Sequence, residues 1–195
     1  VQWTSLDGSS TEERNGDGTG ANDYTDTATA ATATVIEELS LDKRLPSGAS
    51  TTYAVGETVT FELEVTIMEG TTPALVLQDR LPAGMRYVTG SATLDAGQSN
   101  ALISIGAISE TWVSGTGLLT LDLGDVVNSS TNNGSDDSFV ITYQTIVENV
   151  ATNQGGTTLT NDATVDAEDV NDAALPQDQD QVSISLVEPE LDIQK

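Results

Sequence analysis

A strict alternation of apolar and polar side chains constrains this chain more than any other feature. In residues 57–67 (ETVTFELEVTI) every second residue is apolar, and the residues between them are threonine or glutamate. Because successive side chains of a strand point to opposite faces, this pattern predicts a half-buried antiparallel strand. Similar alternation recurs in residues 74–81, 118–127, 139–147, 159–165 and 182–186.

Turn-forming residues separate these runs. They are Pro46-Ser47-Gly48, Glu69-Gly70, Pro82-Ala83-Gly84 and the polar stretch 128–137. Proline and glycine favour turns through their restricted or permissive backbone angles, and Asn, Asp and Ser bond their own backbone. Several short strands joined by polar turns, with the helical period nearly absent, predict an all-β antiparallel sandwich.

The composition narrows the chemistry. The 195 residues include 31 acids, 6 bases, no Cys and no His, which gives a net charge of −25. The missing Cys and His exclude thiol redox chemistry, nucleophiles paired with histidine and most zinc or copper sites. The negative charge argues against nucleic acid and anionic membranes as partners, and no apolar run approaches the ~18 residues that span a bilayer. We therefore expect a structural or binding protein, without direct membrane insertion and without enzymatic turnover.

A short internal repeat indicates a tandem array. Residues 38–43 read ELSLDK and residues 190–195 read ELDIQK, an offset of 195 − 43 = 152 residues. Lys43 and Lys195 are the only two lysines of the chain, and both fall at the last position of this motif. The coincidence predicts a repeat period near 152 residues, with Lys195 as the equivalent lysine of the next repeat.

This period sets the expected boundaries. Residues 38–188 would form one complete repeat, residues 1–37 the C-terminal strands of a preceding repeat, and residues 189–195 the first strand of the next. Alternatively, the end segments complete strands on neighbouring subunits. The expected partners are therefore neighbouring repeats of the same chain or neighbouring identical subunits.

The order of the motifs resembles a known family. GETVTFELEVTI, LQDRLPAGMRYVTGSATL, LTLDLGDVVN, FVITYQTIVENV and TLTNDATVDA are similar, in this order, to the DUF11-type repeat of large bacterial and archaeal surface proteins. The leading residues, VQWTSLDG and the later NDY, resemble the end of such a repeat. The resemblance implies an immunoglobulin-like β-sandwich in a secreted, cell-surface stalk, adhesin or filament. Some relatives carry an autocatalytic Lys–Asn isopeptide bond.

Three polar side chains fall on apolar strand faces. Lys43 lies two residues from Leu41 and from Leu45, so all three share one strand face. By the same spacing, Asp79 and Asn161 each share a face with the apolar residues of their own strands. A lone buried charge costs several kcal/mol, so each group needs a partner or must become neutral. An amide between Lys43 and the Asn161 carboxamide would meet this need, with Asp79 as the general acid and base.

Such a bond would close a loop of 161 − 43 = 118 residues. As a chain-entropy cross-link it would contribute roughly 4–5 kcal/mol. The alternative is a buried Lys43–Asp79 salt bridge with Asn161 hydrogen-bonded nearby. Glu62 or Glu64 could replace Asp79 as the acid, but both fall on the opposite face from Phe61.

Acidic loops are the candidate metal sites. Residues 15–26 place Asp17, Asn22, Asp23 and Asp26 among glycines, and such oxygen ligands suit Ca²⁺. Residues 166–180 form a second acidic cluster. A solvated charged loop is the alternative for both. No cofactor is required by the sequence.

Two further features point to other functions. Trp3 and Trp112 could stack on glycans, although a buried tryptophan is commoner in a sandwich. Acid pairs such as Asp136-Asp137 could serve a hydrolase, but nothing in the sequence places two carboxylates on opposing walls of a cleft. The alternatives to a structural repeat are therefore a strand-exchanging filament subunit or a surface module that binds glycan or calcium.

Overall fold

The computed structural model describes residues 39–131 and 137–188. The segments 1–37 and 189–195, Lys195, Trp3 and the candidate calcium ligands Asp17, Asn22, Asp23 and Asp26 lie outside the described residues. The predicted repeat boundaries therefore stay predictions.

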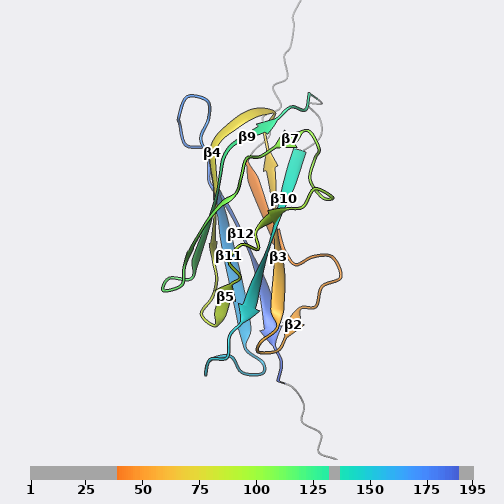
Figure 1. The fold of residues 1–195 in the computed structure, drawn as a ribbon, viewed down its shortest axis with the longest axis vertical. Helices are drawn as coiled ribbons and strands as arrows, with labels where there is room; N and C mark the ends of the chain where they lie inside the picture. The colour runs from red at the N-terminus through yellow and green to blue at the C-terminus, as the bar shows by residue number, and fades with distance from the viewer. Residues whose placement is uncertain (1–38, 132–136, 189–195) are drawn as a thin grey trace, which may run out of the picture. The chain divides into compact units, whose positions relative to one another are not determined.

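The described residues fold into two β-sheets packed face to face, which confirms the all-β sandwich (Figure 1). The first sheet contains β1 (Ser40–Arg44), β3 (Thr58–Ile67), β10 (Asp137–Val147), β5 (Met85–Tyr87) and β6 (Thr93–Leu94). The second contains β2 (Thr52–Tyr53), β12 (Asp178–Leu186), β11 (Thr158–Asp166), β4 (Gly70–Arg80), β9 (Leu118–Asn128), β7 (Ile103–Ser104) and β8 (Ser109–Val113). All pairings are antiparallel except that of β2 with β12. No helix that could cross a membrane occurs in the described part of the chain.

The alternation predicted the long strands correctly. Each of the six runs corresponds to one of β3, β4, β9, β10, β11 and β12. Sequence reasoning did not identify the short strands β2, β5, β6, β7 and β8. Strands of two to five residues are too short to establish a period, and hydrogen bonding to a neighbouring long strand defines them instead.

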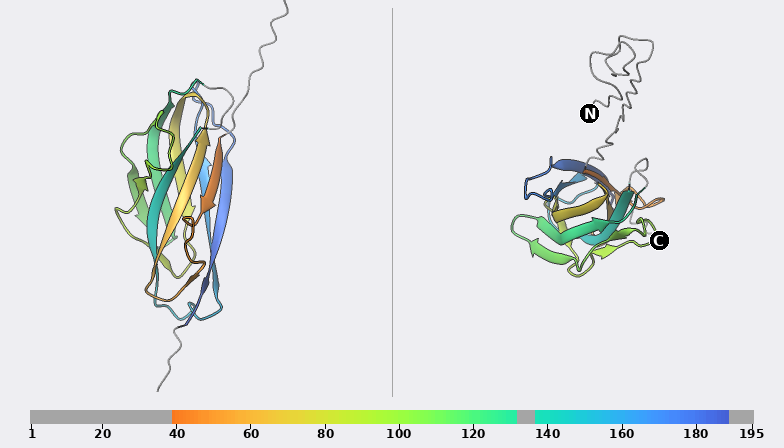
Figure 2. Two further views of the ribbon diagram at one scale, coloured as in Figure 1. Left: turned by 90° about the vertical axis from the view of Figure 1, so that its right-hand side faces the viewer. Right: turned by 90° about the horizontal axis from the view of Figure 1, so that it is seen from above.

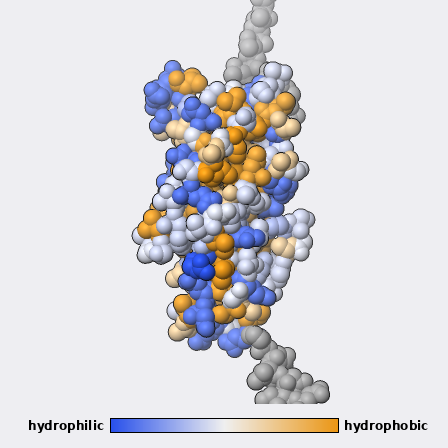
Figure 3. Space-filling model, in the orientation of Figure 1, coloured by the Kyte–Doolittle hydropathy of each residue, from blue (hydrophilic) through white to orange (hydrophobic). Residues whose placement is uncertain are grey.

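The core lies between the sheets. Phe61 on β3 and Tyr143 on β10 are fully buried and stack with ring centroids 5.6 Å apart. Leu77 on β4 and Leu121 on β9 supply the facing layer. Figure 3 shows hydrophilic and hydrophobic residues mixed on one outer surface. The alternation thus sends one row of each long strand inward and the other row to the surface.

The first and last described strands lie side by side, although they belong to different sheets (Figure 2). The backbone N–H groups of Leu41 and Lys43 donate to the carboxylates of Asp178 and Asp180, at 2.8 and 2.7 Å. The donor and the acceptor positions both increase by two residues from the first bond to the second. β1 and β12 therefore run in the same direction. The described chain therefore enters the sandwich at one end and leaves it at the other (Figure 1).

Candidate functional site: a buried lysine cluster

Lys43 is the centre of the candidate site. It lies on β1 opposite Leu63 of β3, and its side chain has no solvent exposure. The ammonium group forms an ion pair with Asp79 Oδ2 and donates a 2.7 Å hydrogen bond to the Tyr143 hydroxyl. It also lies 5.0 Å from the centre of the Phe61 ring. Since Asp79 belongs to β4, the ion pair joins the two sheets.

Tyr143 links the polar groups of the cluster. Its hydroxyl donates to Asp79 Oδ2 at 2.5 Å, and accepts from Lys43 Nζ and, at 2.9 Å, from Asn161 Nδ2. Asp79 and Asn161 are both fully buried. The four side chains come from four strands, β1, β4, β10 and β11, so formation of the cluster requires the complete sandwich.

Burial changes the protonation chemistry of the cluster. Desolvation lowers the pKa of Lys43, although the nearby Asp79 carboxylate opposes this shift. Desolvation also raises the pKa of Asp79, against the opposing charge of Lys43. Both shifts favour the uncharged forms, an amine and a carboxylic acid. A neutral amine is a nucleophile, and a neutral carboxyl can donate a proton.

Two oxygen atoms of the cluster lack a partner. Within the described residues, no hydrogen-bond donor reaches Asp79 Oδ1 or Asn161 Oδ1, and both atoms are buried. Leaving a buried acceptor unsatisfied costs about 1–3 kcal/mol, so such atoms call for an explanation. A proton on Asp79 Oδ1 would change that atom from an unpaired acceptor into a hydrogen-bond donor.

The sequence predicted three members of this cluster but not the fourth. The parity argument placed Lys43, Asp79 and Asn161 on buried faces, and the structure buries all three. The alternation in residues 139–147 places Tyr143 on the apolar face of its strand and predicts no polar role for it. A usable signal was present, because the hydroxyl of a buried tyrosine usually finds a hydrogen-bond partner.

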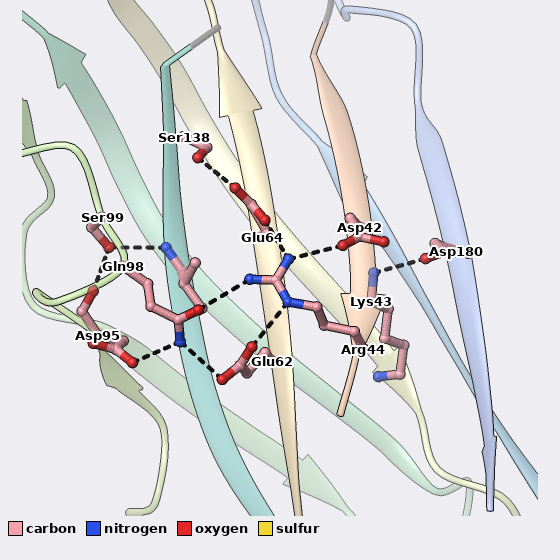
Figure 4. Close-up of polar contacts among 11 residues, drawn as sticks. Asp42, Lys43, Arg44, Glu62, Glu64, Asp95, Gln98, Ser99, Ser138 and Asp180 are labelled. Atoms are coloured by element: carbon pink, nitrogen blue, oxygen red, sulfur yellow. Dashed lines mark hydrogen bonds and ion pairs between the residues drawn. The ribbon is translucent and has the colours of Figure 1, made fainter. Parts of the chain in front are cut away.

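Glu62 and Glu64, the alternative acids, lie on the other face of β3. Arg44 reaches across that strand to both carboxylates, and Gln98 donates to Glu62 at 2.9 Å (Figure 4). Asp42 completes the ion pairs of Arg44. Neither glutamate contacts Lys43, so Asp79 is the acid of the buried cluster.

Other candidate residues of the described chain have structural contacts. Asp169 accepts hydrogen bonds from the backbone of Asn171 and Ala173 in its own loop. Asp137 is buried and accepts a 3.0 Å hydrogen bond from Asn128. Trp112 packs on the core tyrosine Tyr87, with ring centroids 6.1 Å apart. In residues 39–131 and 137–188, no three acidic side chains converge as metal ligands would.

Comparisons with known proteins identify the fold of this chain through solved structures. No protein-family model matches the chain, and no curated protein matches its sequence. The full-length major pilin SpaD from Corynebacterium diphtheriae is 14% identical with a TM-score of 0.52, over 76% of this chain. The 35 kDa C-terminal fragment of the major pilin GBS80 of Streptococcus agalactiae is 12% identical with a TM-score of 0.52, over 77% of this chain. The T6 backbone pilin of Streptococcus pyogenes is 15% identical with a TM-score of 0.50, over 76%.

The matches cover only part of these pilins. This chain spans 35% of the SpaD chain, 56% of the GBS80 fragment and 36% of the T6 pilin. At such low identity the similarity concerns the fold alone. The comparisons therefore establish that the described residues adopt an immunoglobulin-like β-sandwich found in pilin subunits.

Proposed function

We propose that residues 38–188 form a structural module of an extracellular filament shaft or surface stalk, stabilised by a Lys43–Asn161 amide. The observation that carries the proposal is the buried cluster in which Tyr143 contacts Lys43, Asp79 and Asn161. Its partners would be neighbouring repeats or identical subunits. We also propose a relationship to the DUF11-type repeats and no catalytic turnover beyond the single internal reaction.

The proposed reaction conserves atoms and charge. Lys43 gives its proton to Asp79, so that Nζ becomes a neutral amine. Nζ then attacks Asn161 Cγ, and the electron pair of the carbonyl moves onto Oδ1. One proton passes from Nζ to Nδ2, the Cγ–Nδ2 bond breaks, and ammonia leaves. The proposed reaction needs no cofactor or external reagent. It could therefore proceed as soon as folding brings Lys43 and Asn161 together.

The protonation states of Lys43 and Asp79 together set the pH range of this reaction. At low pH, Lys43 is protonated and is not a nucleophile. At high pH, Asp79 loses the proton that it would donate. Because burial lowers the pKa of Lys43 and raises that of Asp79, the rate should pass through a maximum between these limits.

The strand arrangement supports a role under tension. The described chain enters at β1 and leaves at β12, at opposite ends of the sandwich (Figure 1). A bond from Lys43 on β1 to Asn161 on β11 would carry force directly to the strand that pairs with β12. Strands β3, β4, β9 and β10, which lie between the two residues in sequence, would then be bypassed.

Single-molecule pulling on the ends of the full chain tests this role. In the wild type, the loop of 161 − 43 = 118 residues closed by the amide should never extend, because the bond holds its two ends together. Asn161→Ala should release this segment, adding about 400 Å of contour length at ~3.4 Å per residue. Release of the same length from the wild type would contradict a cross-linked shaft.

A further inference from the structure

The Tyr143 hydroxyl lies between the two nitrogen atoms that the proposed reaction exchanges. It is 2.7 Å from Lys43 Nζ, the attacking nitrogen, and 2.9 Å from Asn161 Nδ2, the leaving nitrogen. It also donates to Asp79 Oδ2, which itself contacts Lys43 Nζ. Three contacts therefore connect the attacking nitrogen to the leaving nitrogen, through Asp79 Oδ2 and the Tyr143 oxygen.

We propose that Tyr143 is a catalytic residue of cross-link formation, and that it carries the proton from Asp79 to the leaving nitrogen of Asn161. This inference rests on the proposed Lys43–Asn161 reaction. It assigns to a tyrosine the step that otherwise would be performed by the carboxyl alone.

The hydrogen bond between Tyr143 and Asn161 reverses during this step. In the starting amide, the nitrogen lone pair is delocalised, so Nδ2 donates its N–H to the phenol oxygen. After Nζ has attacked, Cγ is tetrahedral and the lone pair of Nδ2 becomes basic. The phenol then donates its proton to Nδ2 and receives the proton that Asp79 carries. Asp79, now a carboxylate, takes the second proton from Nζ, which became cationic when it attacked Cγ. Tyr143 ends the reaction unchanged, and ammonia leaves from Nδ2.

The same contact also fixes the orientation of the Asn161 carboxamide. With Nδ2 held at the hydroxyl, the leaving group lies next to its proton donor. Burial, followed by the charge of Asp79, raises the pKa of Tyr143 well above its usual value. The phenol therefore stays protonated before the reaction and passes a proton on only as it receives another.

A neighbouring tyrosine provides a matched control. Tyr87 is 1% exposed, and its ring centre lies 6.1 Å from that of Tyr143. Its hydroxyl instead accepts a hydrogen bond from the backbone N–H of Ala92 at 3.2 Å. Tyr143→Phe and Tyr87→Phe therefore each remove one buried hydroxyl from the same core, but only the first touches reacting atoms.

The test follows the loss of ammonia over time. The full chain, Tyr143→Phe and Tyr87→Phe are made by cell-free synthesis and quenched into acidic denaturant at successive times. Intact mass then gives the fraction of each chain that has reacted. We expect Tyr143→Phe to react about 10²-fold more slowly, as for loss of one general acid–base group, and Tyr87→Phe to react as the wild type does.

Folding is measured separately, in a background that cannot react. Lys43→Met and Lys43→Met/Tyr143→Phe are compared by denaturant unfolding. A cooperative transition in the double variant, together with the slow reaction of Tyr143→Phe, would support proton transfer through Tyr143. Loss of that transition would assign Tyr143 a packing role and overturn the inference.

The remaining outcomes separate this inference from the proposed function. Asn161 also lies near enough to Asp79 to lower the pKa of its carboxyl, so a direct route for the proton is the alternative. If Tyr143→Phe loses ammonia as fast as the wild type, the direct route operates and the role of Tyr143 is wrong, while the cross-link stands. If the wild type keeps its ammonia, the cross-link and the inference both fail.

Discussion

Lys43 and Arg44 are adjacent cations on β1, and they occupy opposite environments. The Lys43 side chain is completely buried between the sheets, beside Asp79. The Arg44 side chain is 30% exposed on the outer face, where it pairs with Asp42, Glu62 and Glu64. A single step along the strand therefore separates a desolvated cation from a solvated one.

Burial therefore determines the chemistry of these two cations more than charge pairing does. Both cations have acidic partners, but only Lys43 can lose its proton, because an arginine stays charged at any ordinary pH. On the outer face, the Ser138 hydroxyl and then Arg44 lower the pKa of Glu64, so this carboxylate remains ionised. On the inner face, desolvation favours uncharged groups that can react.

The largest expected effect is that of Lys43→Met. This variant loses the cross-link and leaves Asp79 without its cation. We expect the free energy of unfolding to fall by about 5 kcal/mol, the chain-entropy value for a loop of this length. Denaturant unfolding measures the change. A loss below about 1 kcal/mol, the scale of an ordinary surface ion pair, would show that no cross-link had formed.

Lys43→Arg separates charge from nucleophilicity. The guanidinium keeps the positive charge beside Asp79 but cannot become a neutral amine. We expect a chain of full calculated mass and a stability loss of several kcal/mol, since the cross-link is absent and the larger side chain overpacks the core. Loss of ammonia from this variant would show that Lys43 is not the nucleophile.

The pH dependence of Lys43→Met should report on Asp79. Burial already raises the pKa of this carboxyl, and removal of Lys43 removes the charge that opposes the shift. The folded state then binds the proton more tightly than the unfolded state. Stability should be greatest below about pH 3.9, the usual Asp value, and should fall as pH rises toward the folded pKa.

Denaturant midpoints across this pH range measure the effect, at up to about 1.4 kcal/mol per pH unit. The control is Lys43→Met/Asp79→Asn, in which the carboxyl is absent. This double variant should lack the loss of stability above pH 3.9. An equal loss in both variants would assign the pH dependence to other acids.

The smallest expected effect is that of Arg44→Lys on the outer face. A lysine there would be solvated and would keep partners in Glu62 and Glu64. We expect stability to change by less than about 1 kcal/mol, with no additional loss of ammonia. If a second ammonia were lost, exposure rather than burial would control the reaction, and the contrast between the two faces would fail.

Sequence reasoning reached the fold because the long strands carry their own period. It also placed Lys43, Asp79 and Asn161 inside, because parity depends only on local position. It missed the hydroxyl of Tyr143, whose contacts depend on how β10 lies against β4 and β11. It also missed Asp178 and Asp180, which bind the β1 backbone from a strand 137 residues away in sequence. Pairing across such separations leaves no local pattern.

The intact mass of the folded chain, beside that of Lys43→Ala, decides whether the Lys43–Asn161 amide forms. We expect a wild-type mass lower than calculated by one ammonia, a variant at full mass, and a branched peptide joining residues 43 and 161. Full mass in both proteins would leave Lys43 as an ion-paired core lysine and rule out the cross-link. A deficit of one water instead would identify a carboxyl as the electrophile and contradict the role of Asn161.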